Sequence, residues 1–159
     1  MSDTPRDNPG VIAPPPLIYL GFLLAGWLLS KALGGPDELG LEPQIRRVAA
    51  FVLIVGGLVL EGSAANQFRR LGTRVEPWKP TTALTTDGLY RVSRNPIYVG
   101  FTLMYLGFAV AMDSLIALAF ILPCLVVVDR FVVQREERYL SGKFGAEYDA
   151  YRARVRRWL

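Results

Sequence analysis

The stretch that decides the fold reads IYVGFTLMYLGFAVAM at 97–112, then Asp113 and Ser114, then LIALAFILPCLVVV at 115–128. The first of these apolar runs has 16 residues. As an α-helix it would span about 24 Å, most of the hydrocarbon core of a bilayer. The second run continues past two charged residues to residue 133. Because only two residues separate the runs, the sequence predicts a tight antiparallel hairpin of membrane-crossing helices at 97–133.

Two further apolar runs precede this hairpin, at 17–33 and 48–65, each flanked by charged or Pro/Gly-rich sequence. With the hairpin they predict an all-α integral membrane protein with four transmembrane helices. We divide the chain into three parts. They are a flexible, proline-rich N-terminal tail (1–16), transmembrane helices 1 and 2 (17–70), and a core with a long loop, the hairpin and a C-terminal amphipathic helix (71–159).

Glycines in the second run predict close helix packing, because small residues let helix backbones approach each other in a membrane. They are Gly56, Gly57 and Gly62. They do not form a dinucleotide-binding fingerprint, since no strand precedes them and their spacing is wrong. A Rossmann-type route to a nucleotide cofactor is therefore excluded.

The composition excludes several classes of active site. The chain has no histidine, so histidine acid–base catalysis and histidine-ligated metals are excluded, and we predict no metal site. Its single cysteine, Cys124, lies in an apolar run, where a thiol usually serves as inert packing. The net charge is +4, and the basic residues flank the apolar runs. We therefore expect contacts with anionic lipid headgroups and no nucleic-acid partner.

The basic residues also predict the orientation in the membrane. Six lysines and arginines lie between residues 66 and 96, and seven follow residue 134. Since cytoplasmic loops carry an excess of Lys and Arg, we expect both segments and the N-terminus on the cytoplasmic side of an inner or plasma membrane. The turn at Asp113 would face outward. Arg46 and Arg47 fall on that outer side and are exceptions to the rule.

A 26-residue loop at 71–96 joins the second and third runs. A loop of this length in a compact protein is usually functional. Asp87-Gly88 is a turn signal, and Asn95-Pro96 predicts a helix that begins with proline and is capped by asparagine. These signals leave unexplained a set of aromatic and basic side chains beside them: Tyr90, Arg91, Arg94 and Tyr98.

The C-terminal segment, 134–159, is charged and amphipathic. Leu140, Phe144, Tyr148 and Tyr151 recur at spacings of four, four and three, which places them on one face of a helix. Taken alone, this pattern is typical of a helix that lies on lipid headgroups.

Three linked segments carry a family resemblance: GLYRVSRNPIYVG (88–100), EERYL (136–140) and FGAEYDAY (144–151). In order and spacing they resemble the C-terminal core of isoprenylcysteine carboxyl methyltransferases and of related membrane phospholipid methyltransferases. The resemblance covers about residues 73–159. It implies an enzyme that transfers a methyl group from S-adenosylmethionine to a lipophilic small molecule, lipid or prenylated substrate, as protein-S-isoprenylcysteine O-methyltransferase does.

The resemblance also implies the residues of the site. Carried over by position, the cofactor pocket would comprise Thr82, Ala83, Leu84, Thr85, Tyr90, Asn95, Pro96, Ile97, Tyr98 and Glu136. Catalytic roles would fall to Glu137, Arg135 and Arg94. Such a pocket is chemically sensible, because carboxylates and aromatic faces both favour a sulfonium cation. It requires that the loop at 82–98 and the segment near Glu136 fold against each other.

Two positions depart from the family pattern. Asn95 stands where the family usually has histidine, so a protonated imidazole is not required here. Val132 stands where the eukaryotic enzymes have the arginine that binds the substrate carboxylate, and Arg130 and Arg135 are nearby alternatives. The acceptor is therefore left open among a prenylcysteine carboxylate, a phospholipid amine and a small thiol.

Methyl transfer from a sulfonium is a direct in-line displacement, which needs alignment and exclusion of water more than a protein nucleophile. An amine acceptor would need a base, for which Glu137 is the candidate. An alternative of another class is a non-catalytic membrane scaffold or transporter subunit. The apolar runs offer only Glu61 and Asp129 as acidic groups, both near predicted ends, which disfavours a transporter.

Overall fold

The computed structural model of the protein describes residues 8–70, 72 and 81–159. Two parts of the predicted regions, 1–7 of the tail and most of 71–80 in the loop, lie outside the described residues. The described residues form helices and contain no strand. The helices are α1 (Pro15–Leu33), α2 (Pro43–Arg70), η1 (Gly88–Arg91), α3 (Pro96–Ala111), α4 (Leu115–Ala119), α5 (Ile121–Val128), η2 (Asp129–Val133), α6 (Gln134–Phe144) and α7 (Ala146–Arg154). The predicted all-α class is confirmed.

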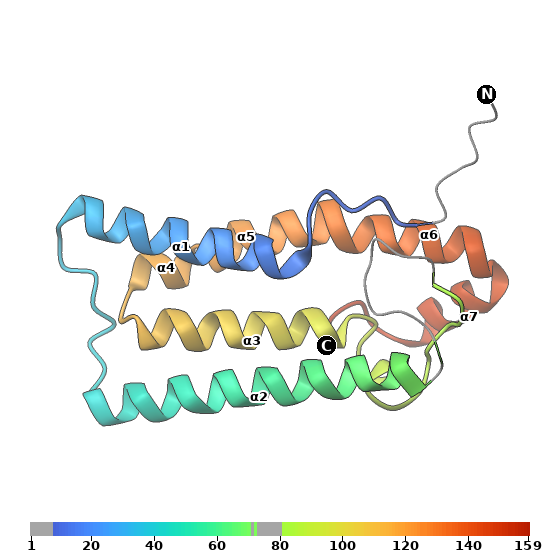
Figure 1. The fold of residues 1–159 in the computed structure, drawn as a ribbon, viewed down its shortest axis with the longest axis horizontal. Helices are drawn as coiled ribbons and strands as arrows, with labels where there is room; N and C mark the ends of the chain where they lie inside the picture. The colour runs from blue at the N-terminus through green and yellow to red at the C-terminus, as the bar shows by residue number, and fades with distance from the viewer. Residues whose placement is uncertain (1–7, 71, 73–80) are drawn as a thin grey trace.

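The helices form an elongated bundle (Figure 1). α2 packs along α3, and α1 packs along α3, α4 and α5. The elements α4, α5, η2 and α6 follow one another as a single rod, which α7 leaves by turning back. The rod is interrupted at Phe120, because Pro123 lacks the N–H that would bond to the carbonyl of Ala119. A π-helical turn, η2, interrupts it again just before Glu136 and Glu137.

In the described part of the chain, three helices are long and apolar enough to cross a membrane: α1, α2 and the rod Leu115–Phe144. α3 is apolar but has only 16 residues. Three of the four predicted crossings are therefore confirmed as candidates, and the crossing by α3 stays a prediction. Large apolar side chains such as Phe51, Leu58 and Leu122 are exposed, as expected for a bundle whose solvent is lipid.

Close packing of α2 on α3 depends on glycine at particular positions. A Cβ added at Gly57 would lie 2.6 Å from the carbonyl oxygen of Gly100, and one at Gly107 would lie 3.0 Å from that of Ala50. Added at Gly56 or Gly62, it would meet nothing within 4 Å. The prediction of close packing is confirmed for Gly57 and wrong for the other two.

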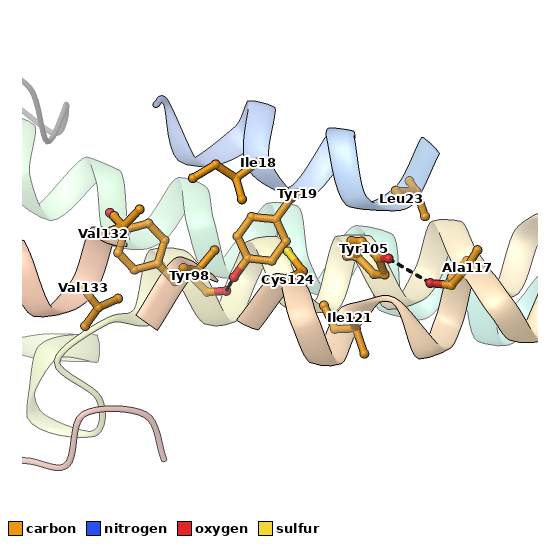
Figure 2. Packing of buried hydrophobic residues seen from close by; sticks show 12 residues of the cluster. Ile18, Tyr19, Leu23, Tyr98, Tyr105, Ala117, Ile121, Cys124, Val132 and Val133 are labelled. Atoms are coloured by element: carbon orange, nitrogen blue, oxygen red, sulfur yellow. Dashed lines mark hydrogen bonds between the residues drawn. The ribbon is translucent and has the colours of Figure 1, made fainter. Parts of the chain in front are cut away.

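The main core lies between α1, α3 and the rod (Figure 2). Tyr19 donates a hydrogen bond of 3.2 Å to the backbone carbonyl of Tyr98, and Tyr105 donates one of 2.8 Å to the carbonyl of Ala117. Cys124 is fully buried between them, which fits a packing role. These buried hydroxyls find acceptors on neighbouring helices and so tie α1, α3 and α4 together.

We call the end of the bundle at the Asp113 turn the turn end (residues 34–47 and 112–116). Here Arg46 forms an ion pair with Asp113, and Asp113 also accepts a hydrogen bond of 3.1 Å from the backbone N–H of Leu39. Asp37 accepts from the Ser114 hydroxyl and, at 2.8 Å, from the backbone N–H of Ile116. Arg46, an exception to the charge rule, is therefore neutralised by a carboxylate beside it.

We call the opposite end the tail end (residues 61–70, 81–98 and 134–159). The segment predicted as one amphipathic helix is two helices here, α6 and α7, because the chain reverses at Gly145. The φ of Gly145 is +52°, a value that glycine adopts at little cost. The reversal buries Tyr148 and Tyr151 against Ala64 and Tyr90, so the predicted face packs on protein.

The last residues fold back along the start of α3. The backbone N–H of Arg94 donates to the carbonyl of Arg156 at 3.0 Å, and the Asn95 amide donates to the carbonyl of Arg157 at 2.9 Å. Trp158 packs against the main core. Asn95 is the N-cap residue of α3, as predicted, but its side chain makes no capping hydrogen bond and bonds to the tail instead.

Candidate active site

A cavity of about 230 Å³ lies at the tail end. Its walls come from the start of α1, from α2, from the loop and η1 before α3, and from α3, α6 and α7. The loop at 81–98 and the segment near Glu136 therefore fold against each other, which was the geometric condition for a cofactor pocket. Most of the residues predicted for that pocket line this cavity: Ala83, Leu84, Thr85, Tyr90, Asn95, Ile97, Tyr98 and Glu136.

Two residues predicted for the cofactor pocket do not line the cavity. Thr82 is exposed beside it, and Pro96 is buried at the first turn of α3, where proline fits a helix start. Of the residues predicted to be catalytic, Arg94 and Glu137 line the cavity and Arg135 does not. The guanidinium of Arg135 instead donates 2.5 Å to the carbonyl of Gly10.

Residues 8–14 of the predicted flexible tail lie against the bundle. Pro9 lines the cavity together with Pro15 and Pro16 of α1. Val11 and Ala13 pack against the main core. This segment therefore covers one side of the cavity, and Arg135 of α6 holds it there through Gly10.

Glu136 is held in place by Tyr98. The Tyr98 hydroxyl donates a hydrogen bond of 2.6 Å to Oε1 of Glu136, which joins α3 to α6 across the cavity wall. The second oxygen of Glu136 makes no hydrogen bond to the described residues. A carboxylate with one anchored oxygen and one available oxygen is oriented to accept a cation or a donor from a ligand.

Glu137 is the centre of an ion network. Its oxygens accept from Arg94 at 2.8 Å and from Arg157 at 2.7 and 3.1 Å, and Arg157 also contacts Asp129 at 3.2 Å. The hydrogen bonds that Arg157 donates to Glu137 raise the pKa of Arg157 above its ordinary value. Both oxygens of Glu137 are thus engaged by cations, which suits it to position Arg94 rather than to accept a proton.

Arg94 and Thr85 have polar atoms without partners. Nε and Nη1 of Arg94 and Oγ1 of Thr85 are buried and make no hydrogen bond to any residue that the structure describes. The Arg94 side chain is only 9% exposed, and both residues line the cavity. Buried polar atoms in native proteins are nearly always paired, and leaving one unpaired costs about 1–3 kcal/mol. A ligand carrying a carboxylate or another acceptor would satisfy these groups.

The aromatic side chains of the cavity come from α2, η1, α3, α6 and α7. Burial, with smaller effects of Tyr151, Glu136 and Glu61, raises the pKa of Tyr90, so its hydroxyl stays a neutral donor. Burial also raises the pKa of Tyr148 to about 12, with Glu137 adding to the effect. The cavity thus combines neutral phenol rings with carboxylates, a setting that favours a cation beside an aromatic face.

Val132 stands where the eukaryotic enzymes of the family have a substrate-binding arginine, and no nearby arginine that the structure describes takes that place. Val132 is fully buried in the main core, Arg130 is exposed, and Arg135 binds Gly10. Among the described residues, the guanidinium that lines the cavity belongs to Arg94.

Sequence reasoning missed Arg157 and Asp129 as parts of the site. Asp129 gave a signal, since a carboxylate inside an apolar run is costly and commonly functional. Arg157 gave none, because its role depends on the tail folding back.

The model of the phospholipid methyltransferase family matches residues 45–147, which span all the elements from α2 to the start of α7. The chain belongs to this family. As a phospholipid methyltransferase family member, it is expected to transfer methyl groups, and its apolar helices agree with a membrane protein.

Three relatives are similar to parts of this chain. An uncharacterized protein of Haemophilus influenzae is 35% identical over 63 residues, which are 40% of this chain and 100% of that protein. Protein-S-isoprenylcysteine O-methyltransferase B of Arabidopsis thaliana is 40% identical over 76 residues, 45% of this chain and 36% of that enzyme. Protein-S-isoprenylcysteine O-methyltransferase of Schizosaccharomyces pombe is 40% identical over 75 residues, 45% of this chain and 30% of that enzyme. The chain thus spans about a third of the length of the two enzymes.

Proposed function

We propose that this protein is an S-adenosylmethionine-dependent methyltransferase that acts on a lipophilic acceptor at the cytoplasmic surface of a membrane. The observation that carries the proposal is the tail-end cavity. It brings the anchored carboxylate of Glu136 and the unpartnered donors of Arg94 together within the segment that the family model matches.

The residues of the cavity fit the chemistry of S-adenosylmethionine. This cofactor has a carboxylate, an ammonium and a sulfonium, and it supplies a methyl group on a sulfur that leaves as a neutral thioether. Arg94 and Thr85 offer buried groups that lack partners, which suits the carboxylate. Glu136 offers a free oxygen for a cationic part of the cofactor, and the ring of Tyr90 lines the same space.

The chain's own residues have to bind, align and exclude water. We assign Glu137 the role of holding Arg94 in the cavity wall, because both of its oxygens are engaged by guanidinium groups. We assign Arg135 the role of holding residues 8–14 over the cavity, through Gly10. Such positioning accelerates an in-line displacement without a protein nucleophile.

The lipophilic acceptor and the membrane orientation belong to the same proposal. Phe68, Leu84, Phe101 and Leu140 line the cavity beside its polar groups, which suits an amphiphilic molecule. Exposed arginines at the tail end, including Arg69, Arg70 and Arg91, support a cytoplasmic position for it. In this arrangement α3 is a fourth crossing, shielded from lipid by α1 and α2.

Calorimetry with S-adenosylmethionine on the purified full chain in detergent tests the proposal. We expect the wild type to bind. We expect Glu136→Gln to weaken binding by about 100-fold, because a charge-assisted contact is worth up to about 3 kcal/mol. The matched control is Glu147→Gln, since Glu147 is exposed on α7 and does not line the cavity.

Circular dichroism checks that both variants keep their helices. If the folded wild type produces no heat with the cofactor, the proposal is wrong. A non-catalytic scaffold or transporter subunit then becomes the better explanation.

A further inference from the structure

Glu61 lies on the wall of the cavity formed by α2, outside the three segments that carry the family resemblance. Its side chain is half-buried, and it lines the cavity. It makes no hydrogen bond or ion pair with the described residues. An acidic side chain in a membrane-spanning helix is costly, and such residues are retained mainly where they have a function.

The packing of α2 on α3 brings Glu61 to the cavity. A Cβ added at Gly100 would lie only 2.9 Å from the Cβ of Glu61 and 2.9 Å from the carbonyl oxygen of Gly57. The absence of a side chain at Gly100 therefore lets Glu61 pack directly on α3, two residues along that helix from Tyr98. The unpartnered atoms of Arg94 and Thr85 independently mark the same cavity as a ligand site.

Among the described residues, the charges around the cavity do not cancel. In the ion network, the guanidinium groups of Arg94 and Arg157 are offset by the carboxylates of Glu137 and Asp129. Two carboxylates that line the cavity, Glu61 and Glu136, have no cation as a partner among the described residues. Glu136 is assigned to a cationic part of the cofactor, so the carboxylate of Glu61 is left to attract a cationic acceptor and to repel a carboxylate.

We propose that Glu61 is the acceptor-side catalytic residue, which binds the protonated amine of an amphiphilic acceptor and removes its proton. This inference rests on the proposed methyltransferase function and narrows its acceptor to a lipid-like amine. Position 132 agrees with an amine acceptor. It is occupied by a fully buried valine, which offers no guanidinium to bind an acceptor carboxylate.

The step balances in charge and atoms. The acceptor ammonium gives one proton to the Glu61 carboxylate, which leaves a neutral amine and a neutral carboxylic acid. The nitrogen lone pair then forms a bond to the methyl carbon, while the bond from that carbon to sulfur breaks and its electron pair stays on sulfur. The products are a methylated ammonium and a neutral thioether. The proton on Glu61 leaves to water when the product departs.

The acceptor preference of the wild type tests this inference without any substitution. We would offer hexadecylamine, hexadecanoic acid and hexadecanethiol in detergent micelles with S-adenosylmethionine and identify methylated products by mass spectrometry. We expect the N-methylated amine as the main product. A methyl ester or a methyl thioether as the main product would overturn the inference and leave the proposed function standing.

The variant Glu61→Gln tests the residue itself. We expect kcat/KM for hexadecylamine to fall by about 100-fold, the usual scale for loss of a general base. Calorimetric binding of S-adenosylhomocysteine should change less than about threefold, since the residue acts on the acceptor. The variant's rate should rise about tenfold per pH unit from pH 7 to 9, because free amine then replaces the missing base. Glu147→Gln is the control.

Unchanged amine kinetics in Glu61→Gln would show that the inference is wrong even if cofactor binding is intact. Failure of the wild type to bind cofactor would instead refute the proposed function. The two failures are therefore distinguishable.

Discussion

Both ends of the bundle carry ion pairs, but they differ in whether polar atoms remain without partners. At the turn end, Arg46, Asp113 and Asp37 all have partners within the described residues. At the tail end, a larger network leaves unpartnered atoms on Arg94 and Thr85, around a cavity. Since unpaired buried polar groups are rare in native proteins, the comparison separates an end that closes the bundle from an end prepared for a ligand.

Both ends use charge to connect segments that are distant in the chain. At the turn end the connection is between the α1–α2 loop and the start of α4, through Asp37 and Ser114. At the tail end, Arg157 connects the last residues to α6 and η2. What differs is burial: Glu137 is almost fully enclosed, whereas Arg46 and Asp113 remain partly exposed. Loss of a tail-end contact should therefore lower the free energy of unfolding more than loss of a turn-end contact.

The largest loss of stability is expected from Glu137→Gln, which breaks the tail-end ion network. The amide keeps the size of the side chain but leaves the buried guanidinium of Arg94 without a counter-charge. Removal of one partner from a buried ion pair costs about 3–5 kcal/mol, and we expect about 3 here. Thermal unfolding in detergent measures it, with the exposed Glu147→Gln as control. A melting curve identical to that of the wild type would contradict the role given to Glu137.

A smaller loss of stability is expected from Gly57→Ala, which disturbs the α2–α3 contact that places Glu61 at the cavity. The new methyl group would lie 2.6 Å from the Gly100 carbonyl oxygen, so the helices must separate. Overpacking of this kind costs about 1–3 kcal/mol. The matched control is the adjacent Gly56→Ala, where a Cβ meets nothing within 4 Å and the higher helix propensity of alanine would add up to about 1 kcal/mol of stability.

Unfolding by a denaturing detergent compares the two glycine variants directly. Equal stability of Gly57→Ala and Gly56→Ala would mean that α2 and α3 are not in backbone contact. The inference about Glu61 would then lose its geometric basis.

The smallest effect is expected from Asp113→Asn at the turn end. Asparagine tolerates the positive φ of +53° at this position and loses only the ion pair with Arg46. A partly exposed pair is worth less than about 1 kcal/mol, so the melting temperature should change little. Calorimetry should show unchanged affinity for S-adenosylmethionine. A large loss of affinity would show that the two ends are coupled, against the separation drawn between them.

Sequence patterns predicted the helices, and the family resemblance implied much of the cavity. The hairpin at 97–133 followed from apolar runs with two residues between them, and Pro96 marked the start of α3. These helical features could be predicted because apolar runs, proline and short turns act over a few residues. The convergence of the loop with Glu136, which the resemblance implied, is confirmed.

The site residues beyond the motifs could not be predicted in the same way. Nothing near Arg157 indicates that it bonds to Glu137, and nothing near Glu61 indicates that it lines the same cavity as Tyr98. The amphipathic face ending at Tyr151 was recognised, but its burial on protein required the reversal at Gly145. Such contacts join segments that are far apart in the chain, so local patterns hold little information about them.

The sequence by itself determined an all-α chain rich in membrane-length helices, the absence of histidine chemistry, and the motifs of a methyltransferase family. The tertiary structure alone decided which polar groups face one another. It paired Glu137 with Arg94 and Arg157, and within the described part of the chain it left Glu61 and Glu136 without cations in a shared cavity. The physical reason is that helix formation depends on neighbours in sequence, whereas the charge balance of a site depends on how helices pack.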